Sequence, residues 1–298
     1  MAELLQLIIS GTAQGMIYAL IAFGYNITFS TSKTINFSLG NLLMVGGVVG
    51  FILYMDKATG QPLGRMIWLP ILAVLIVNSL LGLVVYKTAV EPSLKRNSEY
   101  SWVLATLAFG LIVRNLVEQL WSTNDYRFAS PLGDTPIRIA GVGVYPQELL
   151  IIGVAVFIVV AVELFRRKTI FGKAVSAVSE DKQTASLMGI NQNFVLQFSF
   201  MLSTAIAGIA GILVAPITFV SASMGLTLGI KAYAVAIIGG LESGYGMLVG
   251  GLLLGLSESF TARYISTGYK DTPGFVLLII VILFMPSGLF GKKVIKKV

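Results

Sequence analysis

The sequence predicts an all-α polytopic membrane protein, and its composition and its long apolar runs carry that prediction. Of its 298 residues, 56% are hydrophobic and only 12% are charged, whereas a soluble globular domain carries about 25% charged residues. Apolar runs of about 18 residues or more recur along the chain, and each is long enough to cross a hydrocarbon core about 30 Å thick as a helix. The chain has no cysteine and no histidine, which excludes disulfides and the usual haem, iron–sulfur and zinc sites. No metal site is expected.

We expect about nine transmembrane helices, within a range of eight to ten, some of them broken, in a single transmembrane domain over residues 1–298. The first run lacks the basic start and small-residue cleavage site of a signal peptide, so it is expected to be retained as a span. The spans are expected near residues 4–29, 35–55, 67–90, 102–121, 144–165, 195–219, 229–241, 246–260 and 273–289.

Basic residues indicate the orientation of the spans, because Lys and Arg concentrate in loops that stay in the cytoplasm. With nine spans, three basic segments fall on one face: Lys87 with Lys95 and Arg96, the run 166–182, and the tail 292–297. We therefore expect a multi-pass protein of the cytoplasmic (inner) membrane, with its N-terminus outside and its C-terminus in the cytoplasm. The net charge of +7 is attributed to this orientation, with membrane lipids and no nucleic acid as partners.

Small residues recur in the later spans at spacings that favour close helix packing. In lipid there is little hydrophobic drive between helices, so rows of glycine let backbones approach and gain dispersion contacts. Ordinary packing within the bundle is the favoured interpretation, and a subunit or gating interface is the alternative. The glycines concerned are Gly208, Gly211, Gly246, Gly250, Gly251 and Gly255.

Glycine and proline also interrupt the helical pattern, notably in STSKTINFSLGN, at Pro216 and in GGLESGYG. Irregular backbone at membrane depth survives only where protein or a water-filled cavity satisfies its polar groups. Polar residues beside the first break or in the first span are therefore candidates to line a path for a small solute, although they could instead cap helices and bridge neighbours. These candidates are Gln14, Tyr18, Asn26, Asn36, Ser38 and Asn41.

Charged residues inside spans cost about 2.5–3.5 kcal/mol at the centre of the bilayer, so each needs a partner or water. Arg114 and Glu118 stand at i and i+4 and are predicted to pair on one helix face. Lys231, Glu242 and Glu258 are expected near span ends, where long side chains reach the headgroups. No chain of buried acidic residues is predicted, so coupling to an ion gradient is not favoured.

The stretch FGKAVSAVSEDKQTASLMGI, at residues 171–190, is polar and helix-like although it lies between two strongly apolar runs. Gly189 stands where a left-handed helix cap is common. A small, flat helix face suits docking into a groove of a partner, and a plain loop helix is the alternative. The residues predicted to share that face are Ala174, Ala177, Val178, Asp181 and Ala185.

This segment resembles the cytoplasmic coupling loop of ABC importer permeases, specifically that of the branched-chain amino acid permease family of the LivH type. Ser176 departs from the pattern, since the family often carries Arg there. The blocks GMIYALIAFGYNITFSTSKTINFSLGNLLMVGG and AYAVAIIGGLESGYGMLVGGLLLGLSES also look like the family's, so the likeness covers nearly the whole chain. The positions that match the loop pattern are Gly172, Lys173, Ala174, Asp181, Ala185, Gly189 and Ile190.

The resemblance implies a type II-like ABC importer permease bundle that moves branched-chain amino acids or a related small polar solute. Its coupling loop, about residues 166–194, would dock on two ATP-binding cassette subunits, LivF-like and LivG-like. A second homologous permease, LivM-like, and an extracytoplasmic solute-binding protein would complete the importer. The implied coupling residues are Gly172, Lys173, Ala174, Ala177, Asp181, Ala185 and Gly189.

No enzymatic activity is expected of this chain. It lacks the GxxxxGK[ST] loop that cradles phosphates, so no cofactor is expected here, and ATP and Mg would be bound by the partner subunits. An intramembrane enzyme is disfavoured because no convincing nucleophile and base spacing occurs. The alternative function is a stand-alone secondary transporter or channel for a small solute, which would need its own coupling-ion site or selectivity ring.

Overall fold

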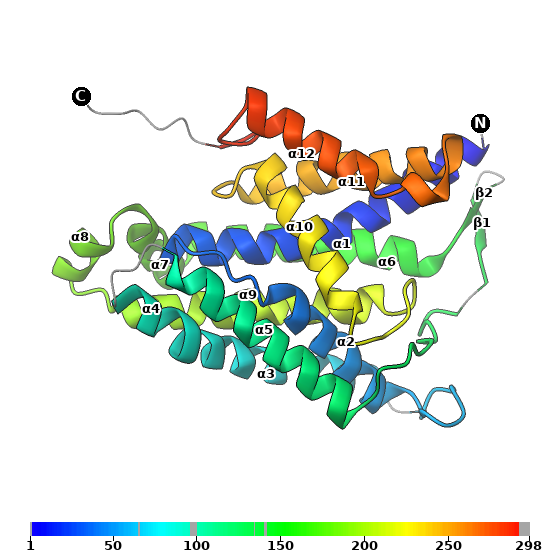
Figure 1. The fold of residues 1–298 in the computed structure, drawn as a ribbon, viewed down its shortest axis with the longest axis horizontal. Coiled ribbons are helices and arrows are strands. Elements are labelled where there is room, and N and C mark those ends of the chain that lie inside the picture. The colour runs from blue at the N-terminus through cyan, green and yellow to red at the C-terminus, as the bar shows by residue number, and fades with distance from the viewer. Residues whose placement is uncertain (1, 65, 96–99, 134, 140–141, 292–298) are drawn as a thin grey trace.

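Apolar helices lie side by side along the long axis of the molecule, with two shorter helices inclined among them (Figure 1). The computed structural model describes residues 2–64, 66–95, 100–133, 135–139 and 142–291. Its elements are α1 (Ala2–Ser32), α2 (Leu39–Tyr54), α3 (Trp68–Val85), a π-helical turn (Tyr86–Val90), α4 (Glu91–Lys95), α5 (Ser101–Leu120), β1 (Ile137–Ile139), β2 (Val142–Val144), α6 (Pro146–Lys168), α7 (Ile170–Glu180), α8 (Lys182–Leu187), α9 (Gln192–Val214), α10 (Met224–Gly239), α11 (Gly244–Tyr264), a 3₁₀ turn (Thr267–Tyr269) and α12 (Thr272–Phe284).

Each apolar range expected from the sequence contains a helix, but fewer of them can cross a membrane alone. Within the described residues, six helices are long and apolar enough to do so, or up to seven if α10 and α11, which meet at a bend of 119°, count as one span. α2 has 16 residues, a length of about 24 Å at about 1.5 Å per residue. The expected count of about nine is therefore high, because it took α2, α10 and α11 as separate complete crossings.

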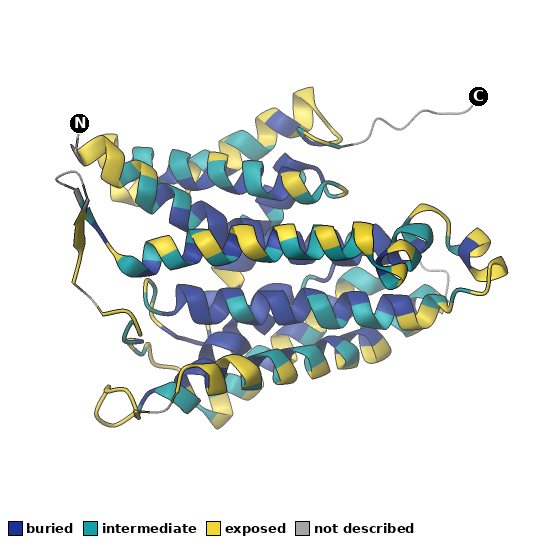
Figure 2. Cartoon of the chain, turned by 180° about the vertical axis from the view of Figure 1, so that it is seen from behind, coloured by how far each residue is buried: buried dark blue, intermediate teal, exposed yellow. Residues whose placement is uncertain are grey.

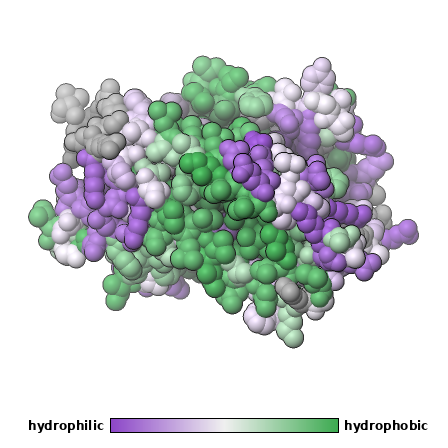
Figure 3. All heavy atoms as spheres, turned by 60° about the horizontal axis from the view of Figure 1, so that its bottom comes forward, coloured by the Kyte–Doolittle hydropathy of each residue, from purple (hydrophilic) through white to green (hydrophobic). Residues whose placement is uncertain are grey.

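The buried core runs along the centre of the bundle. Of the most apolar 18 consecutive residues, 67% are buried in α1 and in α9, against 11% in the span formed by the 3₁₀ turn and α12. The outer helices instead present large apolar side chains outward, so exposed and buried residues alternate along them (Figure 2). On the face shown in Figure 3, apolar atoms form a central band with polar atoms on both sides of it. This distribution is that of a chain whose outer surface contacts lipid.

The glycines that the sequence places at helix contacts lie against the backbone or side chains of neighbouring helices. α1 and α11 pack backbone to backbone, because a Cβ on Gly251 or Gly255 would meet the backbone of Gly15. Gly208 of α9 lies between Gly46 of α2 and Asn78 of α3, and Gly211 lies against α2. Gly246 and Gly250 lie against Gly239, across the bend between α10 and α11. Substituting these glycines would therefore push helices apart.

The two ends of the bundle differ. α4, α7 and α8 gather at one end, and the N-terminus and the β1–β2 hairpin lie at the other (Figure 1). The hairpin, in which Ile137 lies opposite Val144, was not expected from the sequence. Two of the three basic segments thus share the α7–α8 end. Arg96 and the tail 292–297 lie outside the described residues.

Arg114 and Glu118 of α5 pair at 2.8 Å, which confirms the predicted pair at i and i+4.

Candidate functional site

Two short helices, α2 and α10, begin inside the bundle and cross at their first turns. Gly40 packs directly on Gly225, so that a Cβ on either residue would meet the carbonyl oxygen of the other. Ser38 and Ser223 precede the two helices, and neither side chain makes a capping hydrogen bond. Neither first turn carries an acidic residue. Two of the first N–H groups donate to turn carbonyls, that of Leu39 to Asn36 at 3.0 Å and that of Met224 to Ser221 at 3.3 Å. No side chain caps either turn, so the crossing brings together two positive dipole ends.

A pocket of about 90 Å³ lies beside this crossing. One water needs about 10–15 Å³, so the pocket has room for several non-hydrogen atoms. Aromatic rings contribute to its wall, since the centroid of Phe37 lies 5.3 Å from that of Tyr233, and Tyr25 lies edge-on to Tyr233 at 6.0 Å. We call it the crossing pocket; its lining residues are Tyr25, Phe37, Gly40, Asn41, Leu107, Gly225, Leu226, Gly229, Ile230 and Tyr233.

Three of the six path candidates lie at or next to the crossing pocket. Asn36 Oδ1 accepts hydrogen bonds from the backbone N–H of Ser38 at 3.2 Å and from its hydroxyl at 2.6 Å, which holds the break before α2 in shape. The backbone N–H of Phe37 donates to Thr106 Oγ1 of α5 at 3.3 Å. Asn41 lines the pocket. Asn36 Nδ2 and Asn41 Oδ1 are buried without a hydrogen-bond partner, so this region contains one donor and one acceptor that the protein leaves unpaired.

Gln14 and Tyr18 lie elsewhere, in a charged cluster between α1, α10, α11 and α12. Gln14 donates to the Tyr18 hydroxyl, and that hydroxyl donates to Glu258 Oε2, each at 2.8 Å. Lys231 Nζ pairs with Glu258 at 2.9 Å and with Asp271 at 2.6 Å. This cluster borders a second pocket of about 160 Å³. The path candidates therefore do not form one continuous polar row.

The expectation that Lys231 and Glu258 reach the headgroups from span ends is wrong. Glu258 is fully buried and is paired across the bundle, because an isolated charge at that depth would be costly. The available signal was that Lys231 is the one charged residue within α10, and such a residue needs a buried partner. Glu242 differs, since it pairs with Lys33 at 2.6 Å and is half-exposed. Asn26, the sixth path candidate, donates to the carbonyl of Leu241 at 2.8 Å and so bridges α1 to the bend.

At the α7–α8 end, the expected single helix over 171–190 is interrupted at Asp181. This residue is extended, with φ −150° and ψ 111°, and it ends α7 and caps α8. Its carboxylate accepts from the backbone N–H groups of Gln183 and Thr184 and from the Thr184 hydroxyl, at 2.8, 3.2 and 2.7 Å. These hydrogen bonds, that of the Thr184 hydroxyl foremost, hold the pKa of Asp181 below its usual value. Asp181 therefore acts as a helix cap and does not share one continuous helix face with Ala185.

The small-residue face expected to dock on a partner is turned partly inward. Val178 and Ala185 are buried and pack with Val175 and Val195. Ala174 and Ala177 are half-buried, and Lys173 is exposed. Gly172 packs against the end of α6, where a Cβ would meet the carbonyl of Phe165. Gly189 has φ +83°, and the N–H of Ile190 donates to the carbonyl of Ala185 at 3.1 Å, as in a left-handed cap.

Large apolar residues that the sequence analysis did not single out are exposed at this end. Ile170 is 89% exposed, Leu187 88% and Met188 79%. The segment is also joined to the bundle, because Lys182 Nζ donates to the carbonyl of Ser32, at the end of α1, at 2.8 Å. Burial, and secondarily the charge of Lys33, lower the pKa of Lys182. The segment is thus exposed on one side and anchored on the other.

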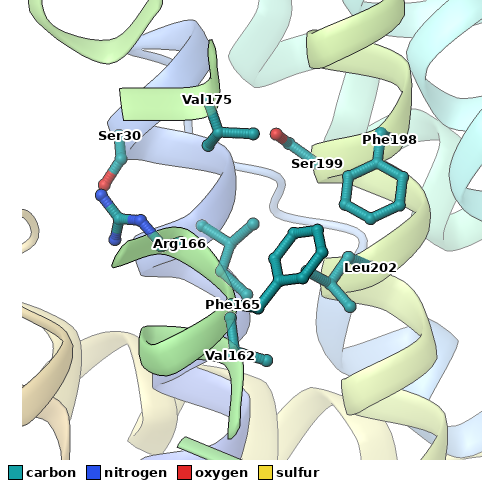
Figure 4. A pocket seen from close by; sticks show the side chains of 9 residues that line it. Ser30, Val162, Phe165, Arg166, Val175, Phe198, Ser199 and Leu202 are labelled. Carbon is teal, nitrogen blue, oxygen red and sulfur yellow. The ribbon is translucent and has the colours of Figure 1, made fainter. Parts of the chain in front are cut away.

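Behind α7, a small cavity of about 10 Å³ lies between α1, α6, α7 and α9. Figure 4 shows Arg166 turned towards Ser30, with the rings of Phe165 and Phe198 on the other side of the cavity. Its volume is that of about one water. This cavity is too small to hold a solute.

The sequence pattern of the family described as "Branched-chain amino acid transport system / permease component" matches residues 7–285. The chain belongs to this permease family. The permease is 30% identical to the high-affinity branched-chain amino acid transport system permease protein BraD of Pseudomonas aeruginosa, over 99% of this chain and 98% of the relative. It is 29% identical to LivH of Escherichia coli over 99% and 97% of the two chains. The fructose import permease protein FruF of Bifidobacterium longum is 24% identical over 89% and 73%. No solved structure matches the permease. The resemblance expected from the sequence is confirmed.

Proposed function

We propose that this permease is the membrane-spanning subunit of an ATP-binding cassette importer for branched-chain amino acids. Two ATP-binding cassette subunits, LivF-like and LivG-like, hydrolyse ATP and bind its Mg. A LivM-like second permease shares the translocation path, and an extracytoplasmic binding protein delivers the solute. The permease itself binds no cofactor and makes or breaks no covalent bond.

The observation that carries the proposal is the likeness over almost the entire chain to BraD and LivH, which are both named as branched-chain amino acid transport permeases. The α7–α8 segment supports it independently. Ile170, Leu187 and Met188 are exposed and give this segment a surface with large apolar side chains, of the kind that a partner protein covers. The coupling residues expected from the sequence are assigned to holding this surface in place: Gly172, Ala177, Asp181, Ala185 and Gly189 shape the two helices, and Lys173 and Ala174 lie beside them.

In this proposal the α7–α8 end is cytoplasmic, so the N-terminus lies outside and the C-terminus lies in the cytoplasm. The grouping of Lys87, Lys95 and the basic residues from 166 to 182 at one end supports this orientation. A cysteine placed at Met188 would then be labelled by a membrane-impermeant maleimide only in inverted vesicles, and one placed at Leu63 only in intact cells. The natural chain has no cysteine, so each label has a single target.

Transport by the assembled importer in proteoliposomes tests the proposal. Uptake of radiolabelled leucine, with the binding protein present, is expected to require ATP and to continue after ionophores collapse the ion gradients. Replacing Gly172 with leucine, which would collide with the backbone of α6, should reduce uptake more than ATP hydrolysis. Leu63→Ala, at an exposed position on the opposite end, is the matched control. Uptake that survives ATP depletion and stops with the ion gradient would establish the stand-alone transporter instead.

A further inference from the structure

The geometry points to the crossing pocket as a solute site, in which the first turns of α2 and α10 bind a carboxylate and Asn41 binds an ammonium group. The site would take a small zwitterion, an α-amino acid with an aliphatic side chain. This inference rests on the proposed function for the identity of the transported solute. It adds the place at which the permease itself holds that solute.

The first step concerns charge. The N-terminus of a helix carries a partial charge of about +0.5, so two of them at one crossing sum to about one positive charge, which matches one carboxylate. Ser38 and Ser223 leave both first turns without a side-chain cap, and neither turn holds an acidic residue. Gly40 and Gly225 place the two backbones in direct contact. Two like dipole ends held together in a low-dielectric interior repel each other, and a bound anion offsets that repulsion.

The second step concerns the side chain of Asn41, which stands in the first turn of α2 and adds an observation separate from the dipole. Its side chain lines the crossing pocket, is 92% buried (8% exposed), and has an amide Oδ1 without a hydrogen-bond partner. An unpaired buried acceptor costs about 1–3 kcal/mol, and an ammonium group is the strongest donor that an amino acid offers it. An unpaired acceptor beside two helix N-termini that lack side-chain caps is an arrangement that favours a zwitterion over a simple anion.

The third step concerns size and surroundings. The pocket volume of about 90 Å³ accommodates several non-hydrogen atoms. Phe37 and Tyr233 provide aromatic surface for an aliphatic side chain, and the pocket reaches the outside of the bundle at Leu226 and Ile230, which are about half-exposed. Asn41 contacts Gly110, which lies halfway along α5. The site is therefore near the middle of the membrane, where a translocation path needs an intermediate stop.

The charged cluster around Lys231 is the competing location for a carboxylate, and its own charges disfavour it. Lys231 already pairs with two carboxylates, Glu258 and Asp271, so the lining of the second pocket has an acidic excess; Lys270 contacts Gln14 at 3.5 Å but does not line that pocket. A further carboxylate there would be repelled. The crossing pocket is lined by no acidic residue.

The test is equilibrium binding to the purified importer complex without ATP and without the binding protein. Radiolabelled leucine is displaced by unlabelled leucine, by leucinamide, which lacks the carboxylate, and by 4-methylpentanoate, which lacks the ammonium group. Both analogues are expected to bind about tenfold or more weakly than leucine. Equal displacement by leucine and leucinamide, or no leucine binding at millimolar concentration, would overturn the inference.

Two variants with matched controls locate the site. Ser223→Asp places a carboxylate at the exposed N-cap of α10, where it occupies the same N–H groups. It should weaken leucine binding about tenfold and change leucinamide binding by less than about twofold. Ser223→Ala adds no carboxylate at this position, so it should bind leucine like the natural protein. Asn41→Ala should abolish the preference for leucine over 4-methylpentanoate. Identical behaviour of the two Ser223 variants would refute the site.

ATP-dependent leucine uptake by the unaltered complex separates the two levels of the proposal. If that uptake occurs but binding ignores the carboxylate, the site is wrong and the function stands. If ATP-dependent uptake of leucine is absent, the proposed function itself fails.

Discussion

The charged cluster of Lys231, Glu258 and Asp271 predicts a definite ranking of stability losses. Lys231→Met leaves Glu258, which is 0% exposed, with only the Tyr18 hydroxyl as a partner, and stranding a buried charge costs about 3–5 kcal/mol. Glu258→Gln leaves Lys231 paired with Asp271 at 2.6 Å, so its cost is about 1–3 kcal/mol. Asp271 is 59% exposed, and Asp271→Asn should cost less than about 1 kcal/mol.

The assay is unfolding of the purified permease by sodium dodecyl sulfate in mixed micelles, followed by circular dichroism, which yields a free energy for each variant. The double variant Lys231→Met with Glu258→Leu removes both buried charges, so it should be more stable than Lys231→Met alone. A Lys231→Met protein that is as stable as Asp271→Asn would show that the cluster is solvated and that the reasoning from burial is wrong.

Three further outcomes follow from the structure. Gly40→Ala places a Cβ against the backbone of Gly225 and should lower the free energy of unfolding by at least about 1–3 kcal/mol in the same assay. Gly153→Ala on α6, where no atom lies within 4 Å of the added Cβ, should be neutral or stabilise by up to about 1 kcal/mol. Equal losses in the two variants would contradict the close crossing. Asp181→Asn keeps a capping oxygen for α8 and should preserve ATP-driven uptake, and Asp181→Ala should lower uptake while hydrolysis continues. The pKa of Asp181 is held below its usual value of about 3.9, so the charged cap is present above that pH and is lost only as the pH falls through the lowered pKa. The ratio of uptake by the natural complex to uptake by the Asp181→Asn complex should therefore stay constant from pH 8 to 5. A step in this ratio between pH 8 and 5 would contradict the assignment. Lys33→Glu and Glu242→Lys should each uncouple uptake from ATP hydrolysis. Each should change the free energy of unfolding by less than about 1 kcal/mol, since both side chains are over one third exposed. The double variant, which restores the ion pair with its charges exchanged, should restore coupling, and failure of this rescue would contradict a role for the pair.

The positions of the long helices were predictable because apolar length is a property of one segment at a time. The ranges 102–121 and 144–165 coincide with α5 (Ser101–Leu120) and α6 (Pro146–Lys168) within a few residues. What the sequence analysis missed was depth. α2 and α10 are as apolar as a crossing, yet they start inside the bundle, and the sharp return at Gly240, with φ +94°, depends on backbone contacts with the segment after α12.

Residues of the candidate site were predictable only where their role depends on the neighbouring sequence and not on tertiary packing. Asn36, Ser38 and Asn41 were singled out beside a break, because polar side chains at an interrupted apolar run must serve the freed backbone, and the structure places them at or next to the crossing pocket. Their separation from Gln14 and Tyr18 depends on tertiary packing, as does the partner of Glu258. Asp181 was placed on a helix face because its spacing fits 3.6 residues per turn, but an Asp is equally suited to cap a helix, and here the cap prevailed.

The two functional regions are joined by a short series of contacts. Lys182 in α8 donates a hydrogen bond to the carbonyl of Ser32. The residue after Ser32, Lys33, pairs with Glu242 in the bend after α10. At the other end of α10, Gly225 lines the crossing pocket. Lys33 has φ +60°, the one positive value among the described non-glycine residues, a conformation that costs of order 1–3 kcal/mol and persists only where its surroundings impose it. A displacement of α8 therefore acts first on a strained residue, and then on the far end of the helix that forms one wall of the pocket. If ATP-binding cassette subunits dock at the α7–α8 end as proposed, a displacement there would reach the bend after α10 through the Lys33–Glu242 pair, and a shift of α10 would move Gly225 against Gly40.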